Sequence, residues 1–238
     1  EYAQLYFAIF KNAENHVAII EALAAQPQGL SRSDIAQITK IAEGSLSRAL
    51  EELLESDFLS LIPPFHKKKK EAVYKLIDLY SLFYLKFIAP QKQGGANAWE
   101  ILSQQSGHNA WSGYAYENVC LMHITQIKKA LGVSSVQTQQ SAWRFKGDDT
   151  YPGAQIDLVI DRADQCVNLC EAKFTKENFA IDKSYAEKLR IKKAVFKYAT
   201  DTKKAIFTTL FTTYPTLKNQ YYQEEIANEV TMDKLFES

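Results

Sequence analysis

Apolar residues recur at helical spacing in the first part of the chain and predict three helices. The first covers residues 3–25 and ends before Pro27. Ser31 with Asp34 three residues later is typical of a helix N-terminus, so a short helix is expected there. A third helix is expected from Glu43 onward. Two short helices joined by a tight turn form the helix-turn-helix pattern.

Two short strands are expected next, over residues 58–62 and 72–77, with a basic loop between them. A strand pair of this kind after a helix-turn-helix predicts a winged helix. We expect its DNA contacts to be phosphate contacts from the arginine of the third helix and from the loop, namely Arg48, Lys67, Lys68, Lys69 and Lys70. The third helix also carries four glutamates, which oppose such contacts. Contact of the winged helix with another domain, instead of DNA, is therefore an alternative interpretation.

The second half of the chain mixes strand-like and helix-like patterns and predicts an α/β (α+β) fold with a mixed central sheet. Helices are expected at 79–89, 113–131, 184–200 and 219–227, and strands at 133–138, 141–145, 155–160, 167–174 and 205–211. Pro and Gly residues near position 90 mark a linker. The predicted domains are a winged helix with flanking helices (1–90), a linker (91–112) and a second domain (113–238).

Composition narrows the functional classes. Acidic and basic residues number 28 each, so the net charge is zero and DNA binding must depend on a local patch. The three cysteines form no CxxC pair, which argues against a zinc site or a disulfide framework and favours a cytoplasmic setting. No apolar run has the length of a membrane span, so no membrane contact is expected.

Charged residues inside two apolar strands require an explanation. Asp157 lies in one predicted strand and Glu171 and Lys173 in the next, and a polar turn joins the two. Alternation places Glu171 and Lys173 on one face. Buried charges are costly unless they are paired or bound to metal. Two carboxylates, with the carbonyl of Ala172, would suit Mg²⁺ or Mn²⁺, and Lys173 would assist a water molecule.

This spacing resembles the D…(D/E)xK core of the PD-(D/E)XK restriction-endonuclease-like superfamily. Asp157 and Glu171–Ala172–Lys173 correspond to its core motif, although Ile156 replaces the proline of the family name. The resemblance implies a restriction-endonuclease-like fold for 113–238 and a metal-dependent endodeoxyribonuclease site. Glu117, on the preceding predicted helix, resembles the glutamate that often completes such sites. Tyr185 and Lys188 on the following helix are further candidates.

The order of the two halves resembles the C-terminal part of archaeal-type AAA+ ATPases. The segment Tyr74–Asp78 followed by Leu82–Ile88, between the winged helix and the nuclease-like half, carries this likeness. No GxxxxGK(S/T) motif is present, so ATP would bind only to a domain absent from this chain. The start at Glu1 fits this expectation of a fragment. The resemblance implies DNA and the ATPase domain as partners, and the oligomeric state stays open.

Three functions are compatible with the sequence. The first is a Mg²⁺- or Mn²⁺-dependent phosphodiesterase acting on DNA, which the complete set of Asp157, Glu171 and Lys173 favours. The second is a non-catalytic module that binds DNA or protein and regulates an ATPase, which the balanced charge favours. The third is a transcription regulator whose second half binds a ligand without metal.

Overall fold

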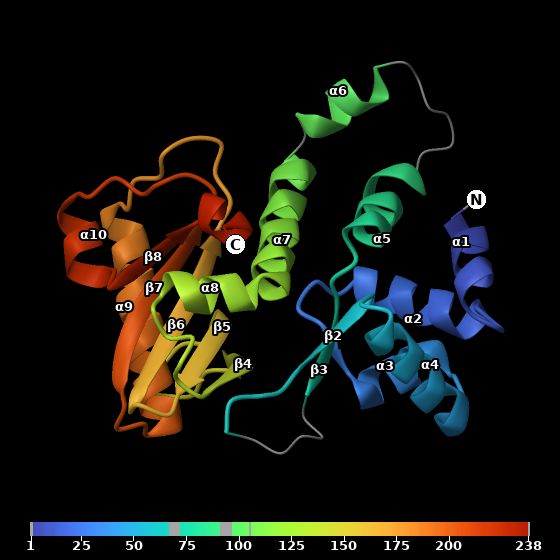
Figure 1. Cartoon of the computed structure of the whole chain (residues 1–238), viewed down its shortest axis with the longest axis horizontal. Coiled ribbons are helices and arrows are strands. Elements are labelled where there is room, and N and C mark those ends of the chain that lie inside the picture. The colour runs from blue at the N-terminus through green and yellow to red at the C-terminus, as the bar shows by residue number, and fades with distance from the viewer. Residues whose placement is uncertain (1, 67–71, 91–96, 105, 238) are drawn as a thin grey trace. The chain divides into compact units, whose positions relative to one another are not determined.

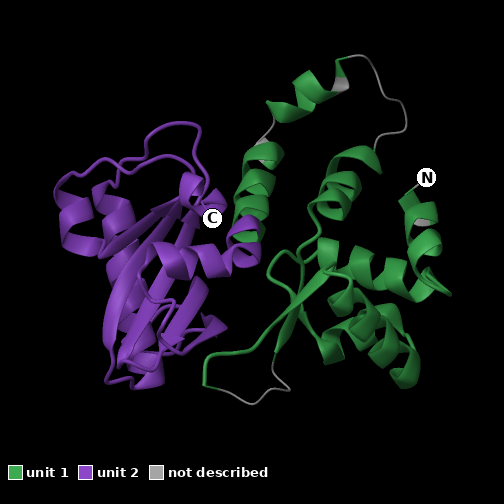
Figure 2. Ribbon diagram, viewed as in Figure 1, with its two compact units in different colours: residues 1–118 green, residues 119–238 purple. Residues whose placement is uncertain are grey.

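The computed structural model of the 238-residue chain describes residues 2–66, 72–90, 97–104 and 106–237. It divides into two compact units, residues 1–118 and 119–238 (Figure 2). Each unit has its own sheet and its own buried apolar cluster. The predicted linker, 91–112, includes one short helix and the beginning of a long one.

The first unit is mainly helical and contains one small sheet (Figure 1). Its sheet has the order β1-β3-β2, and all pairings are antiparallel. In chain order the elements are α1 (Tyr2–Ile9), α2 (Glu14–Ala24), β1 (Leu30–Ser31), α3 (Arg32–Thr39), α4 (Glu43–Glu55), β2 (Leu59–Ile62), β3 (Val73–Leu76), α5 (Leu79–Phe83), the π-helical turn η2 (Tyr84–Ile88), α6 (Ala98–Ser103) and the first part of α7 (Ser106–Met122). The elements from α2 to β3 form a winged helix, as predicted.

Local sequence signals explain the helix-turn-helix. Ser31 and Asp34 form a reciprocal capping box at the start of α3, as expected. Lys40 adopts a left-handed conformation (φ 57°) that ends α3 and begins the turn. Gly29 is also left-handed (φ 83°), and a Cβ there would lie 2.7 Å from the Tyr74 carbonyl oxygen. Only glycine fits where β1 approaches β3 so closely.

The helix predicted over residues 3–25 was wrong in one respect, because the chain forms α1 and α2 with a break between them. Asn12 has φ 65° at the break, a left-handed conformation that no helix interior contains. Phe10 and Ala13 are buried on either side of the bend, so the apolar spacing continues although the helix does not.

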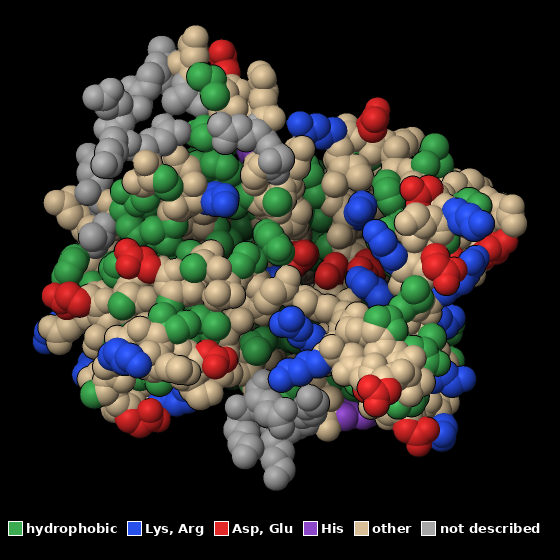
Figure 3. All heavy atoms as spheres, turned by 180° about the vertical axis from the view of Figure 1, so that it is seen from behind, with side chains coloured by type: hydrophobic (Ala, Val, Ile, Leu, Met, Phe, Trp, Pro, Cys, Tyr) green, Lys and Arg blue, Asp and Glu red, His purple; other side chains and the backbone are tan. Residues whose placement is uncertain are grey.

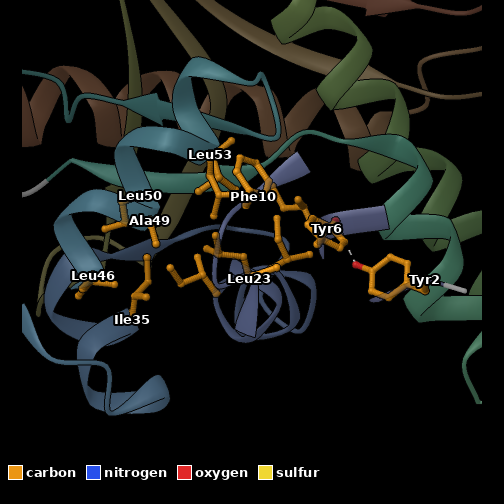
Figure 4. Close-up of a cluster of buried hydrophobic side chains, with 14 residues drawn as sticks. Tyr2, Tyr6, Phe10, Leu23, Ile35, Leu46, Ala49, Leu50 and Leu53 are labelled. Atoms are coloured by element: carbon orange, nitrogen blue, oxygen red, sulfur yellow. Dashed lines mark hydrogen bonds between the residues drawn. The ribbon is translucent and has the colours of Figure 1, made fainter. Parts of the chain in front are cut away.

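The core of the first unit lies between α1, α2, α3 and α4 (Figure 4). Leu46, Leu50 and Leu53 on α4 are at most 1% exposed, so this helix buries the apolar stripe that the sequence predicted. Full burial of such a side chain stabilises a fold by about 1.5–3 kcal/mol. The orientation of α4 is therefore fixed, and its opposite face is left to solvent.

The second unit has a five-stranded mixed sheet of order β4-β5-β6-β7-β8, which confirms the predicted fold class. β4, β5 and β6 are antiparallel, whereas β6-β7 and β7-β8 are parallel. After the end of α7, its elements are α8 (Ile124–Ala130), β4 (Thr138–Phe145), β5 (Ala154–Arg162), β6 (Cys166–Lys173), α9 (Lys183–Thr200), β7 (Ala205–Thr212), α10 (Gln220–Glu225), β8 (Asn228–Thr231) and the 3₁₀ turn η3 (Met232–Phe236).

Helix α9 is the crossover between the parallel strands β6 and β7. Its Ala186 and Leu189 pack with Leu210 of β7 in one buried cluster. Leu210 pairs with Glu171 across the parallel ladder, so both side chains point to the same face. Helix α9 therefore covers the face of the sheet that carries Glu171.

Three other predictions for this half needed correction. The helix predicted at 113–131 begins at Ser106 and is interrupted at His123, so it forms α7 and α8. The strand predicted at 133–138 does not form as such, because residues 133–137 lie in turns, and β4 runs from Thr138 to Phe145 with a bulge between Ser141 and Trp143. The helix predicted at 219–227 ends at Glu225, and β8 follows it. β8 is only four residues long and pairs in parallel with β7, from which α10 separates it.

Candidate functional site

Arg32, the first residue of α3, links α3 to α4 through side-chain contacts. Its guanidinium donates to the Glu43 carboxylate at 2.5 Å and to the Ser47 hydroxyl at 2.7 Å. Both partners lie in the first half of α4. The arginine thus holds the N-terminal ends of the two helices together, and this end of α4 is the part that enters the major groove in a helix-turn-helix complex.

The solvent face of α4 carries charge of both signs. The Arg48 side chain is 76% exposed and donates to Glu52 at 2.8 Å. Glu52 also contacts His16 of α2 at 2.8 Å, whereas Glu51 and Glu55 are exposed. An ion pair at so exposed a position contributes little to stability, so Arg48 can exchange Glu52 for a phosphate at small cost. The glutamates remain unfavourable to a phosphate backbone.

The four wing lysines, Lys67 to Lys70, lie outside the described residues. The strands that flank them, β2 and β3, are antiparallel neighbours, as a wing requires. On the face drawn in Figure 3, Lys and Arg side chains are interspersed with Asp and Glu, in agreement with the zero net charge.

In the second unit, the hairpin of β5 and β6 brings Asp157 and Glu171 together. Leu158 pairs with Cys170, and the same register continued by one residue places Asp157 opposite Glu171. Opposite residues in an antiparallel pair share a face. The Oδ2 atom of Asp157 accepts a hydrogen bond from the Ala172 backbone N–H at 2.9 Å. In a regular strand the N–H and C=O of one residue lie on the same edge, which puts the Ala172 carbonyl on the β5 side of β6.

Glu171 is buried and forms an ion pair with a residue outside the predicted set. The Nζ atom of Lys192, on α9, donates to its Oε2 at 2.5 Å. The Glu171 side chain is 9% exposed and the Lys192 side chain 29%. Lys192 is therefore an additional member of the charge cluster, and it approaches from the helix that covers this face.

Lys173 lies beside two aromatic rings on the same face. Its Nζ is 4.8 Å from the ring centre of Tyr185 and 5.1 Å from that of Phe179. These are cation–π distances. Burial, with smaller effects of the Glu171 and Asp157 charges, raises the pKa of the Tyr185 hydroxyl above its ordinary value. Tyr185 therefore stays uncharged and lines the site with its ring. Lys188, the other candidate on this helix, is exposed.

Glu117 belongs to the other unit, on the part of α7 that precedes residue 119. Its carboxylate accepts from the Nζ of Lys75 on β3 at 3.1 Å, and both side chains are largely buried. The next residue, Asn118, donates to the Leu76 carbonyl of the same strand at 2.9 Å. These contacts anchor α7 to the winged helix. The predicted metal role of Glu117 stays a prediction.

The oxygen atoms of Asp157, Glu171 and Ala172 are of the chemical type that binds a divalent cation. Asp157 and Glu171 supply carboxylate oxygens from adjacent strands, and Ala172 supplies a carbonyl on the same edge. Hard oxygen donors of this kind are those that Mg²⁺ and Mn²⁺ prefer. Among the described residues, no three His, Cys, Asp or Glu side chains converge, so water or substrate would supply the remaining ligands.

Sequence reasoning missed Lys192 and Phe179. A signal for Lys192 exists, because it lies seven residues after Tyr185 and two helical turns return a side chain to the same face. Phe179 lies in the loop before α9, where no periodicity places a side chain.

Comparison with known proteins identifies one part of the chain. The IclR helix-turn-helix domain matches residues 13–61, which run from the start of α2 into β2. These residues form an IclR-type helix-turn-helix DNA-binding domain. None of the curated proteins and none of the solved structures matches the chain. Within the described ranges no helix is long and apolar enough to span a membrane.

Proposed function

We propose that this chain binds DNA through its winged helix and hydrolyses phosphodiester bonds at Asp157, Glu171 and Lys173. The second half of the proposal is supported by the position of Asp157 and Glu171 on adjacent strands, each one residue beyond the paired Leu158 and Cys170, with Lys173 two residues along on the same face as Glu171. Like charges directly opposite in a sheet are destabilising, and a bound cation would offset that cost.

Each residue then has a separate part. Asp157, Glu171 and the Ala172 carbonyl hold a Mg²⁺ or Mn²⁺ ion, which when bound supplies positive charge against the charge that develops on the phosphate. Lys173 orients the attacking water and favours its deprotonated form. The rings of Phe179 and Tyr185 hold the Lys173 ammonium through cation–π contacts.

The partner proposed for this chain is an AAA+ ATPase domain of the same full-length protein. The order of the two halves, with the segments Tyr74–Asp78 and Leu82–Ile88 between them, resembles the C-terminal part of archaeal-type AAA+ ATPases and supports this partner. In this arrangement the ATPase binds ATP, and the chain described here supplies DNA contact and the nuclease-type site.

A specific observation favours a second candidate, a non-catalytic module that binds DNA or protein. Lys192 compensates Glu171, and Lys173 is held by two rings, so the charge cluster is balanced without a metal. Such a cluster would serve only to join α9 to the sheet.

The test is cleavage of plasmid and single-stranded DNA with Mn²⁺ or Mg²⁺, comparing wild type with Lys173→Ala. Lys188→Ala is the matched control, because it removes the same charge from an exposed position on the neighbouring helix. Cleavage lost only in Lys173→Ala supports the enzyme. Cleavage retained in that variant points to a contaminant. Absence of cleavage in all three, with DNA binding intact, favours the non-catalytic module.

A further inference from the structure

Lys192 differs from the other lysines in the second half of α9. Lys193 and Lys197 are exposed, whereas the Lys192 side chain is only 29% exposed and turns towards the sheet. Its ammonium reaches Glu171 rather than solvent, at 2.5 Å from Oε2. A lysine stem of four carbons can make this contact and can also extend to water.

The charges of the cluster sum to zero in the absence of metal. Asp157 and Glu171 contribute two negative charges, and Lys173 and Lys192 contribute two positive ones. Lys173 lies against aromatic rings, whereas Lys192 contacts a carboxylate oxygen directly. That carboxylate belongs to the proposed metal ligand set, so Lys192 and a divalent cation compete for the same negatively charged group. Two cations this close repel each other strongly where burial lowers the effective dielectric constant.

We propose that Lys192 is an internal counter-ion that occupies the cation position at Glu171 and is displaced when a divalent metal binds. This inference rests on the proposed function, because it takes Asp157 and Glu171 as the metal ligands. The exchange needs no backbone movement, since the partly exposed Lys192 side chain has a path to solvent. Lys192 thereby sets the affinity of the site for metal and keeps the empty site stable.

The experiment is Mn²⁺ titration by calorimetry of the full chain, comparing wild type, Lys192→Met, Lys192→Arg and Lys193→Met. Removal of the competing cation in Lys192→Met is expected to tighten Mn²⁺ binding at least tenfold. Lys192→Arg keeps the charge and is expected to stay within about twofold of wild type. Lys193→Met, which removes the same charge from an exposed neighbour, is also expected to stay within about twofold.

Thermal unfolding gives a second measurement. Without metal, Lys192→Met leaves the buried Glu171 without this counter-ion and is expected to lower Tm by about 5 °C. Saturating Mn²⁺ should raise the Tm of this variant more than that of wild type. If the methionine variant does not fold, Lys192→Gln, which can still donate to Glu171, takes its place in both measurements.

The outcomes separate the inference from the proposed function. Equal Mn²⁺ affinity in wild type and Lys192→Met, or weaker binding in the variant, would overturn the counter-ion role and leave the metal site standing. Absence of Mn²⁺ binding in every protein would overturn both. Binding detected only in Lys192→Met would support both.

Discussion

Replacement of Asp157 distinguishes its contribution to the fold from its proposed role in the site. Its Oδ2 accepts the Ala172 N–H at 2.9 Å in a partly buried position. Asp157→Ala leaves that donor without its acceptor, which costs roughly 1–3 kcal/mol. The change also removes repulsion from Glu171, which returns up to about 1 kcal/mol. We therefore expect the free energy of unfolding of the second unit to fall by about 1–2 kcal/mol.

Asp157→Asn should behave differently. The amide oxygen can still accept from Ala172, whereas the repulsion from Glu171 is lost. Its free energy of unfolding should equal that of wild type or exceed it by up to about 1 kcal/mol. Both variants should nevertheless lose at least tenfold in Mn²⁺ affinity, because a neutral side chain is a poor ligand for a hard cation.

Urea denaturation followed by the fluorescence of Trp143 tests these values. This residue is buried in β4, and its ring lies 5.1 Å from that of Phe196, so it reports on the second unit. Trp99 and Trp111 are replaced by Phe in every protein compared. Equal destabilisation by Asn and Ala would refute the hydrogen-bond account. Unchanged Mn²⁺ affinity in Asp157→Ala would refute the ligand role.

Two further predictions concern the first unit. Leu50 is only 1% exposed, so Leu50→Ala should lower the free energy of unfolding of the first unit by about 3 kcal/mol in urea denaturation. Ile38 is 53% exposed, so Ile38→Ala should lower it by less than about 1 kcal/mol. Similar losses in the two variants would contradict the burial of Leu50. Burial raises the pKa of the Tyr6 hydroxyl, so the folded chain keeps a proton that the unfolded chain loses above pH 10. Wild-type stability should therefore fall as pH rises above about 10, by up to about 1.4 kcal/mol per pH unit for this group. Tyr6→Phe should reduce that slope between pH 9 and pH 11 in far-ultraviolet circular dichroism melts, and an unchanged slope would contradict the assignment to Tyr6.

The winged helix could be predicted because its signals are local. The capping residues Ser31 and Asp34 lie within one helical turn of each other, and the apolar stripe of α4 lies within four turns. The break at Asn12 could not be predicted, because apolar spacing continues through it. β8 could not be predicted either, since its four residues become a strand only by pairing with β7.

In the candidate site, too, the sequence predicted the residues placed by local pattern but not those placed by tertiary packing. Alternation along two strands was enough to place Asp157, Glu171 and Lys173 on adjacent strands, and the structure has them there. The contribution of Lys192 depends on how α9 packs on the sheet, which no strand pattern contains. Tyr185 was a candidate from the sequence, and its ring does lie beside Lys173.

The crossover between β6 and β7 also affects the order in which the second unit folds. β5 and β6 are joined by a short turn, so the hairpin can form on the microsecond timescale. Lys192 lies 21 residues beyond Glu171, and the parallel pairing of β7 must wait for the whole of α9. The hairpin therefore brings Asp157 and Glu171 together before Lys192, the cation that pairs with Glu171, arrives. Refolding of the second unit should accelerate with added salt, which screens that early repulsion.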